Sequence, residues 1–199
     1  MSLSNVRILY TAVCIVLGLI IVTPAFMSVV TFSANERFSE LWILGQNHKA
    51  DDYPFNVQQA QTYTVYWSVV NHMGSSEYYA VRMKVGNWTD APPDDRNSVP
   101  SLLDAVVEDR FFIADNDTRE KEVSFSIDNV SFIDDVSTLQ SLIVNNERVQ
   151  VGKACLWNQT ASGFYYQLLF ELWIYDTAAQ NFQFHDRFVN IWLNVTRTT

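Results

Sequence analysis

Three histidines, His48, His72 and His185, are the side chains best suited to acid–base or metal chemistry in this sequence. Each lies in a turn-like stretch, and none accompanies a nucleophile motif such as Gly-x-Ser-x-Gly. The sequence also lacks the closely spaced His and Cys pairs that bind zinc. We therefore predict no catalytic, cofactor-binding or metal-binding residues and expect that the protein is not an enzyme, unless the histidines converge in the fold.

Carboxylates grouped in loops are the other candidates for chemistry. Asp115-Asn116-Asp117 and Asp94-Asp95 place oxygen ligands where a hard cation such as calcium can be wrapped. Neither loop has the central glycine and terminal glutamate of a helix–loop–helix calcium site, so a solvated loop is the simpler interpretation. Asp51 and Asp52, or Asp94 and Asp95, would supply the acid and the base if the protein hydrolysed glycans. That alternative requires two carboxyl groups facing one pocket.

Five sequons of the Asn-x-Ser/Thr type are candidate N-glycosylation sites. Asn-x-Thr is also common in turns, so any single sequon can be unmodified. An excess of sequons favours a domain that faces the cell exterior. The candidate acceptors are Asn87, Asn116, Asn129, Asn158 and Asn194.

Composition and charge restrict the class of protein. Hydrophobic residues make up 48% and aromatic residues 14% of the 199 residues, which favours one packed domain rich in β-strands. The formal net charge is -9 without a cluster of Lys or Arg, so we expect no nucleic-acid partner. The two cysteines, Cys14 and Cys155, lie in different segments, and we expect no internal disulfide and an inert, buried Cys155.

The N-terminal segment carries no charge between residues 8 and 33. About 20 apolar residues suffice for a transmembrane helix, whereas the apolar part of a cleaved signal has about 7–15. Arg7 precedes the run and Glu36 follows it, which favours a cytoplasmic N-terminus. We therefore expect residues 1–34 to form a cytoplasmic stub and a single membrane anchor, and residues 35–199 to form an extracytoplasmic domain. Cleavage of the segment after Ala25 is the alternative.

Alternation of apolar and polar residues predicts most of the domain's strands. The segments 62–70 and 77–85 flank the turn-like residues 71–76, and we expect them to pair as an antiparallel hairpin. The last two strands should be neighbours. The predicted strands are residues 38–44, 62–70, 77–85, 120–127, 139–144, 148–151, 164–175 and 186–195.

One segment has a helical pattern instead. Residues 101–108 space Leu102, Leu103, Val106 and Val107 at helical intervals behind Pro100. Many short strands with turn signals and no alternating helices predict a mainly β fold. We expect an immunoglobulin-like antiparallel sandwich of two sheets with one or two short helical insertions, preceded by a single transmembrane helix.

Several short stretches resemble an archaeal family, domain-of-unknown-function family 1616. They are residues 38–45, 49–54, 69–72 and 188–195, in the order that the family has. The resemblance implies a membrane-anchored, extracytoplasmic β domain at an archaeal cell surface, and it implies no activity or catalytic residue. Members of the family usually carry several membrane helices before the domain, whereas this chain has one candidate.

These patterns favour a binding or scaffolding domain, such as an accessory subunit of a membrane or envelope complex. Its expected partners are the membrane, through the N-terminal helix, other envelope or membrane proteins, and glycans. The alternatives are a surface component that assembles into a lattice or filament through the open edges of its sheets, and a glycan-processing enzyme.

Overall fold

The computed structural model describes residues 7, 10, 12–18, 20 and 37–196, which fall into two compact units, Met1–Arg37 and Phe38–Thr199. In the first unit residues 12–18 are helical, and several apolar side chains are exposed, among them Ile15 and Ile20. The helical residues that are described do not make a helix long and apolar enough to cross a bilayer. The predicted membrane anchor lies mostly outside the described residues.

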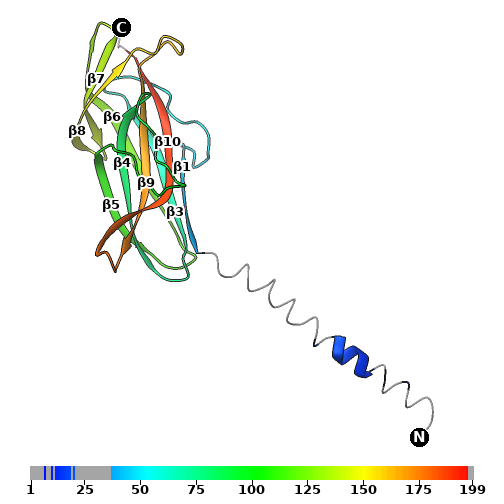
Figure 1. Cartoon of the computed structure of the whole chain (residues 1–199). Coiled ribbons are helices and arrows are strands. Elements are labelled where there is room, and N and C mark those ends of the chain that lie inside the picture. Colours follow the sequence, from blue (N-terminus) through cyan, green and yellow to red (C-terminus); the bar gives the residue numbers. More distant parts are fainter. Residues whose placement is uncertain (1–6, 8–9, 11, 19, 21–36, 197–199) are drawn as a thin grey trace. The chain divides into compact units, whose positions relative to one another are not determined.

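The second unit consists of ten strands in two five-stranded sheets (Figure 1). One sheet has the order β1-β3-β6-β7-β8 and the other β2-β10-β9-β4-β5. All neighbours are antiparallel except β2 and β10. The strands are β1 (Phe38–Leu44), β2 (Asn56–Val57), β3 (Thr62–His72), β4 (Glu77–Asn87), β5 (Ala105–Ile113), β6 (Thr118–Ile133), β7 (Val136–Val144), β8 (Glu147–Leu156), β9 (Tyr165–Asp176) and β10 (Asn181–Val195).

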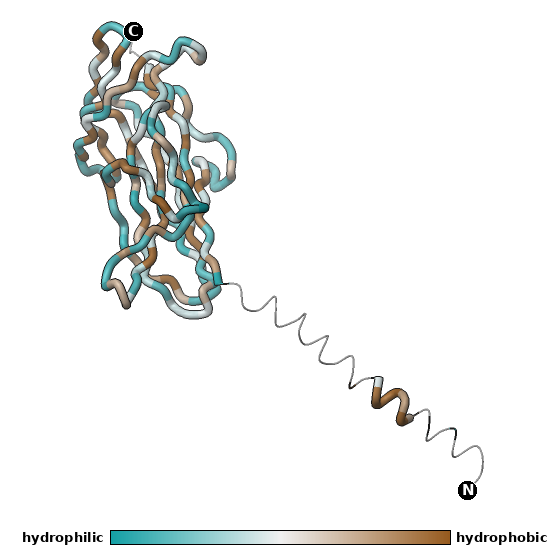
Figure 2. Tube along the Cα trace, in the orientation of Figure 1, coloured by the Kyte–Doolittle hydropathy of each residue, from teal (hydrophilic) through white to brown (hydrophobic). Residues whose placement is uncertain are grey.

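The core lies between the two sheets because alternate residues of each strand point to the same side. From β4 it receives Tyr79, Val81, Met83 and Val85, and from β9 it receives the fully buried Tyr166, Leu168, Phe170 and Leu172. Figure 2 shows that apolar and polar segments both occur along the strands of the sandwich. The prediction of a mainly β fold with two packed sheets is confirmed.

The predicted pairing of residues 62–70 with 77–85 is wrong. These segments are β3 and β4, which lie in different sheets: β3 pairs with β1 and β6, and β4 pairs with β5 and β9. The connection at residues 73–76 therefore crosses from one sheet to the other. Both strands contribute apolar side chains to the same core between the sheets. Periodicity identified the strands but could not distinguish a hairpin from a crossover.

The predicted helical insertion at residues 101–108 is also wrong, because no residue between 37 and 196 is helical. Residues 101–104 belong to a loop in which Leu102 is fully exposed, and β5 begins at Ala105. The β-branched Val106 and Val107 favour a strand, and β4 offers an edge with which Val107 pairs, while Val106 falls in a bulge between Ala105 and Val107. The two last strands pair with each other as predicted.

The first and last strands of the domain begin and end at opposite ends of the sandwich. Phe38 begins β1 at one end, where it pairs with His72 at the end of β3. The final residues of β10 lie at the opposite end, as the N- to C-terminal colouring of Figure 1 shows. The β6–β7 turn and the chain between β8 and β9 lie beside them, and these segments form the pocket described below.

Candidate functional site

The three histidines do not form a common site. His48 stacks on Tyr66 and lies 2.8 Å from Glu120 Oε1. His72 bonds to Asn116 Oδ1 at 3.0 Å. Among the described residues no group of His, Cys, Asp and Glu side chains could hold a metal ion. The arrangement therefore offers no support for a metal centre in the part of the chain that the structure describes.

His185 is the only histidine that bonds to a serine hydroxyl among the described residues. Its Nε2 lies 3.0 Å from Ser39 Oγ, which in turn lies 2.7 Å from the Tyr79 hydroxyl. Ser39 and Tyr79 are buried, and burial raises the pKa of Tyr79 to about 12. A nucleophile must reach its substrate, so this serine and histidine form a structural network between β1 and β10.

Stability is expected to fall below about pH 6.5 because of His185. Burial, and then the nearby Arg187, lower the pKa of His185 from its ordinary value of 6.5. His185 in the unfolded chain then binds a proton at a higher pH than His185 in the folded chain. The stability that the neutral His185 contributes is therefore complete above its pKa in the unfolded chain, and it is lost as the pH falls toward its pKa in the folded chain. Unfolding free energies at about pH 7.5 and pH 5 should differ less in His185→Gln than in the wild type. Equal pH dependence in the two proteins would contradict this.

The carboxylates singled out in the sequence mostly satisfy local backbone groups. Asp94 accepts hydrogen bonds from the Arg96 and Asn97 backbones and from the Asn97 side chain, which lowers its pKa. Asp115 accepts one from the Gly74 backbone at 2.8 Å. These bonds are typical of turns. Neither Asp51 and Asp52 nor Asp94 and Asp95 face a described pocket as a pair, because only Asp52 lines one, a hollow of about 220 Å³.

The sequon asparagines differ in accessibility. Asn87 is 9% exposed, and its Nδ2 donates to Ala154 O at 2.8 Å. The Asn116 and Asn194 side-chain amides donate to Asp115 and Asn56. Asn158 accepts two backbone hydrogen bonds through Oδ1 in a turn, and Asn129 is exposed on β6. Since a glycan is attached through Nδ2, the geometry favours Asn129 and Asn158 and disfavours Asn87.

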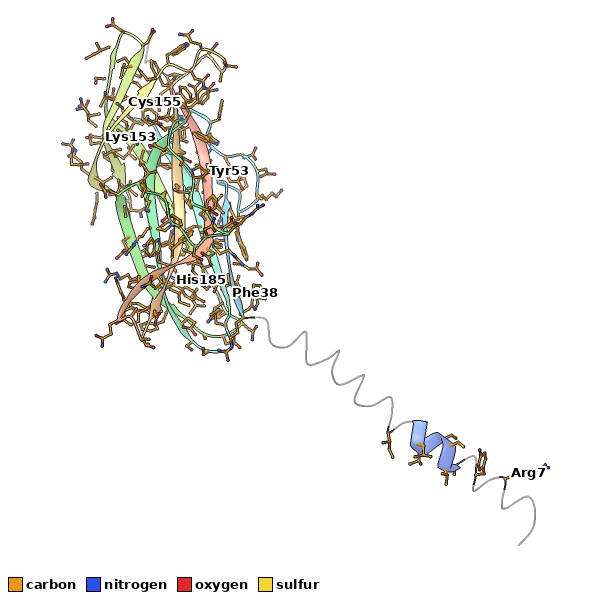
Figure 3. All side chains as sticks on the ribbon, in the orientation of Figure 1. Arg7, Phe38, Tyr53, Lys153, Cys155 and His185 are labelled. Atoms are coloured by element: carbon orange, nitrogen blue, oxygen red, sulfur yellow. The ribbon has the colours of Figure 1, made fainter. Side chains whose placement is uncertain are left out.

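A pocket of about 540 Å³ opens at the end of the sandwich opposite Phe38. This volume lies within the range that small-molecule sites occupy. In Figure 3 this is the end near Cys155. Three chain segments line the pocket: the β6–β7 turn, the chain from β8 to β9, and the end of β10. The lining residues are Asp134, Asp135, Trp157, Ser162, Gly163, Phe164, Asn194, Val195 and Thr196.

Short-range contacts fix the shape of this pocket. The Trp157 N–H donates to Asp135 O at 2.8 Å, and Val195 N donates to Phe164 O at 3.0 Å. The Trp157 and Phe164 rings meet edge to face, with centroids 5.0 Å apart. A Cβ at Gly163 would collide with the Asn194 side chain, so a larger residue at this position would force that side chain to move. The pocket thus combines aromatic surface with carboxylate, amide and hydroxyl groups.

Sequence reasoning missed these residues. Asp134 and Asp135 resemble any other turn between two strands, and nothing in their spacing connects them to Trp157 or Asn194. Two strand pairings bring the three segments together. β7 pairs with β8, which places Val136 opposite Leu156, and β9 pairs with β10, which places Tyr165 opposite Asn194. The adjacent Cys155 fits its prediction, because it is buried and burial raises the pKa of its thiol to about 11.

A buried ion pair on the outward side of the β4–β9 pair was also unexpected. Lys84 Nζ lies 2.8 Å from Glu171 Oε2, and the two side chains are 5% and 0% exposed. Ser101 donates its N–H and its hydroxyl to Glu171 Oε1, and Trp173 Nε1 donates to Oε2. The loop that precedes β5 covers the pair. Every atom of this cluster that carries charge has a partner, so the cluster fixes the loop and leaves no open site.

The solved structures that resemble this domain are distant. A β-glucosidase from Listeria innocua in complex with glucose is 8% identical, with a TM-score of 0.39, over 80% of this chain and 16% of that chain. A second match is one chain of the complex of zinc 2-glycoprotein and prolactin inducible protein from human seminal plasma. It gives a TM-score of 0.38 at 6% identity, over 81% of this chain and 98% of that chain. A Bacteroides fragilis protein assigned as a β-galactosidase gives a TM-score of 0.38 at 10% identity, over 78% of this chain and 16% of that chain.

The chain spans about a sixth of the Listeria enzyme, and likenesses at this level carry no argument about activity. No curated protein matches the sequence. A family model does match, over residues 33–150, which is more than half of the chain and includes β1 to β7 with Asp134 and Asp135. The rest of the pocket, from Trp157 to Thr196, lies beyond the matched residues. The chain therefore belongs to the family described as Domain of unknown function (DUF1616).

Proposed function

We propose that this protein is a membrane-anchored binding domain of a cell surface, and that the pocket at the end opposite Phe38 holds its ligand. One observation carries the proposal: a cavity of about 540 Å³ in which aromatic rings and polar side chains from three segments converge. Such convergence is the usual mark of a binding site. Asp134 and Asp135 both line the pocket, so a glycan-processing enzyme, which needs two carboxyl groups at one pocket, is the second candidate.

A saccharide is the ligand class that suits this lining best. Sugars present an apolar C–H face that packs on an aromatic ring, and hydroxyl groups that bond to carboxylates and amides. Trp157 supplies an aromatic ring, Asp135 a carboxylate and Asn194 an amide. Hence we assign the pocket to a glycan of the cell envelope.

The anchor and the orientation rest on different observations. Residues 8–33 carry no charge, and the described helical residues of this segment expose apolar side chains such as Val13 and Leu17. Such surface requires an apolar environment. The accessible sequons Asn129 and Asn158 support an extracytoplasmic domain, and the two-sheet architecture suits an immunoglobulin-like sandwich. The family resemblance adds an archaeal cell surface. The anchor, the sandwich and the sequons suit an accessory subunit of an envelope complex.

Calorimetric titration tests the pocket. The full chain is placed in lipid nanodiscs, because sugar-headed detergents would compete, and is titrated with neutral hexoses and their disaccharides. At least one probe should bind, and Trp157→Ala should weaken its binding by about tenfold or more, since stacking of a ring contributes about 1–3 kcal/mol. Trp192→Ala is the matched control, because Trp192 is 40% exposed on β10 and does not line the pocket.

Binding that is unchanged in Trp157→Ala, or no binding of any probe, would refute the assignment of the pocket. The orientation has a separate test. Mass spectrometry of the protein from its native membrane should find glycans on Asn129 or Asn158 and none on Asn87, whose amide is buried. A wholly unmodified protein in a host that modifies its surface proteins would count against an extracytoplasmic domain.

A further inference from the structure

Hydrogen-bond acceptors dominate the polar lining of the pocket at the end of the sandwich opposite Phe38. Asp134 and Asp135 contribute two carboxylates, which accept hydrogen bonds and donate none when they are ionised. Asp135 is exposed, and its carboxylate makes no hydrogen bond or ion pair with any other described residue. This carboxylate is therefore available to a ligand.

Neighbouring contacts decide which atoms Asn194 and Thr196 present to the pocket. The Asn194 Nδ2 donates to Asn56 Oδ1 at 3.0 Å, whereas its Oδ1 lies beside Gly163, another lining residue. The Thr196 hydroxyl donates to Val57 O at 3.4 Å, which leaves the lone pairs of the hydroxyl oxygen for a ligand. Both side chains therefore add acceptors to the lining.

Donors are few in the same lining, and cations are absent from its described residues. No Lys, Arg or His is among them. The side-chain donors that remain are the Ser162 hydroxyl and the Trp157 indole N–H, and both are neutral. An anionic ligand would therefore meet two like charges and no described cation. Backbone N–H groups of the lining donate to carbonyl oxygens of the protein at Trp157, Gly163, Asn194, Val195 and Thr196.

We propose that the ligand of this pocket carries a protonated amine, and that the preferred saccharide is an amino sugar whose amine is not acetylated. This inference rests on the proposed saccharide function of the same pocket. An ammonium group donates three hydrogen bonds and supplies the positive charge that the acceptors lack. A cation is also attracted to the face of an aromatic ring, and most strongly to that of tryptophan.

The ring and one carboxylate of the pocket are held next to each other. The Trp157 backbone N–H donates to Asp135 O at 2.8 Å, so the two residues are fixed side by side. One sugar can therefore pack its C–H face on Trp157 while its ammonium group reaches a carboxylate. Acetylation of the amine would remove both the charge and the attraction to the ring.

Calorimetric titration with matched sugars tests this preference. The full chain, in nanodiscs of zwitterionic lipid without amines, is titrated with glucose, glucosamine, N-acetylglucosamine and glucuronate at about pH 6.5. Aspartate is ionised at this pH, and an amine with a pKa like that of an α-amino group, about 7.7–8.0, is protonated. Glucosamine should bind about tenfold more tightly than glucose at low salt, and glucuronate should bind most weakly. N-acetylglucosamine should show no such gain. The preference should shrink at about 0.5 M salt, because ions screen exposed carboxylates.

Asp135→Asn tests the carboxylate and keeps an acceptor oxygen of similar shape. The protein is made without glycosylation, because this substitution creates a sequon with Ser137. The ratio of the glucosamine and glucose affinities should fall to about threefold or less, while glucose still binds and so reports a folded pocket. Asp95→Asn removes the same charge at an exposed position outside the pocket and should keep the full ratio. Arg197→Ala should keep it as well, since Arg197 follows Thr196 in the sequence but lies outside the described residues.

The failure of this inference differs from the failure of the proposed function. If glucose binds and glucosamine binds no more tightly, or if Asp135→Asn keeps the full ratio, the amine preference is wrong and a saccharide pocket remains. Glucuronate that binds as tightly as glucosamine would also overturn the preference. If none of the sugars binds, the saccharide function itself is refuted.

Discussion

Glu171→Leu is expected to lower the free energy of unfolding by about 3–5 kcal/mol, because it leaves the charge of Lys84 buried without a partner. The two side chains are 0% and 5% exposed, so solvent cannot screen the orphaned ammonium. The substitution also removes the acceptor for the backbone N–H and hydroxyl of Ser101. The loop that precedes β5 should therefore loosen together with the ion pair.

A paired substitution separates these effects. Lys84→Met with Glu171→Leu removes both charges and keeps similar volumes, and buried ion pairs replaced in this way often cost little. The double variant should recover most of the stability that Glu171→Leu loses. Urea unfolding of the full chain in nanodiscs, followed by tryptophan fluorescence, measures all three proteins. A double variant as unstable as the single one would show that the loop contact with Ser101 matters more than the charges.

This cluster illustrates what periodicity can and cannot predict. The alternation in β4 and β9 correctly identifies two strands, and it places Lys84 and Glu171 on the face away from the core. A charge on that face predicts solvent exposure. The structure buries both charges because the loop before β5 folds over them, and that loop is the segment for which the sequence predicted a helix. The local pattern could not include a cover that comes from elsewhere in the chain.

The pocket could not be predicted for a related reason. The β6–β7 turn and the chain from β8 to β9 look like ordinary connections, and the end of β10 looks like any other strand end. The pairing of β7 with β8 and of β9 with β10 brings Asp135, Trp157 and Asn194 together. Strands were predictable because the signal lies in neighbouring residues. The assignment of β3 and β4 to different sheets depends on contacts far apart in the chain, and the sequence contains no local signal for them.

Asn71 belongs to one of the short stretches that carry the family resemblance, and it has a structural role that the sequence did not reveal. The residue was expected to favour a tight turn. It makes a turn-type bond with Met73, and it is also fully buried. Its Nδ2 donates to Ser75 O at 2.7 Å and to Ile113 O at 3.0 Å, and its Oδ1 accepts from Met73 N at 2.9 Å and from the Tyr79 hydroxyl at 3.0 Å. One amide thus ties β3 to the crossover, to β4 and to the end of β5.

Asn71→Ala is therefore expected to destabilise the domain by about 3–5 kcal/mol, because several buried polar groups lose their partner at once and each costs about 1–3 kcal/mol. Tyr79 keeps its bond to Ser39, so the loss should be less than the sum of four bonds. Asn129→Ala is the matched control, since Asn129 is exposed on β6 and should change stability by no more than about 0.5 kcal/mol. Urea unfolding of both variants in protein without glycans measures the difference. If Asn71→Ala proved as mild as Asn129→Ala, the crossover between the sheets would be held by packing alone.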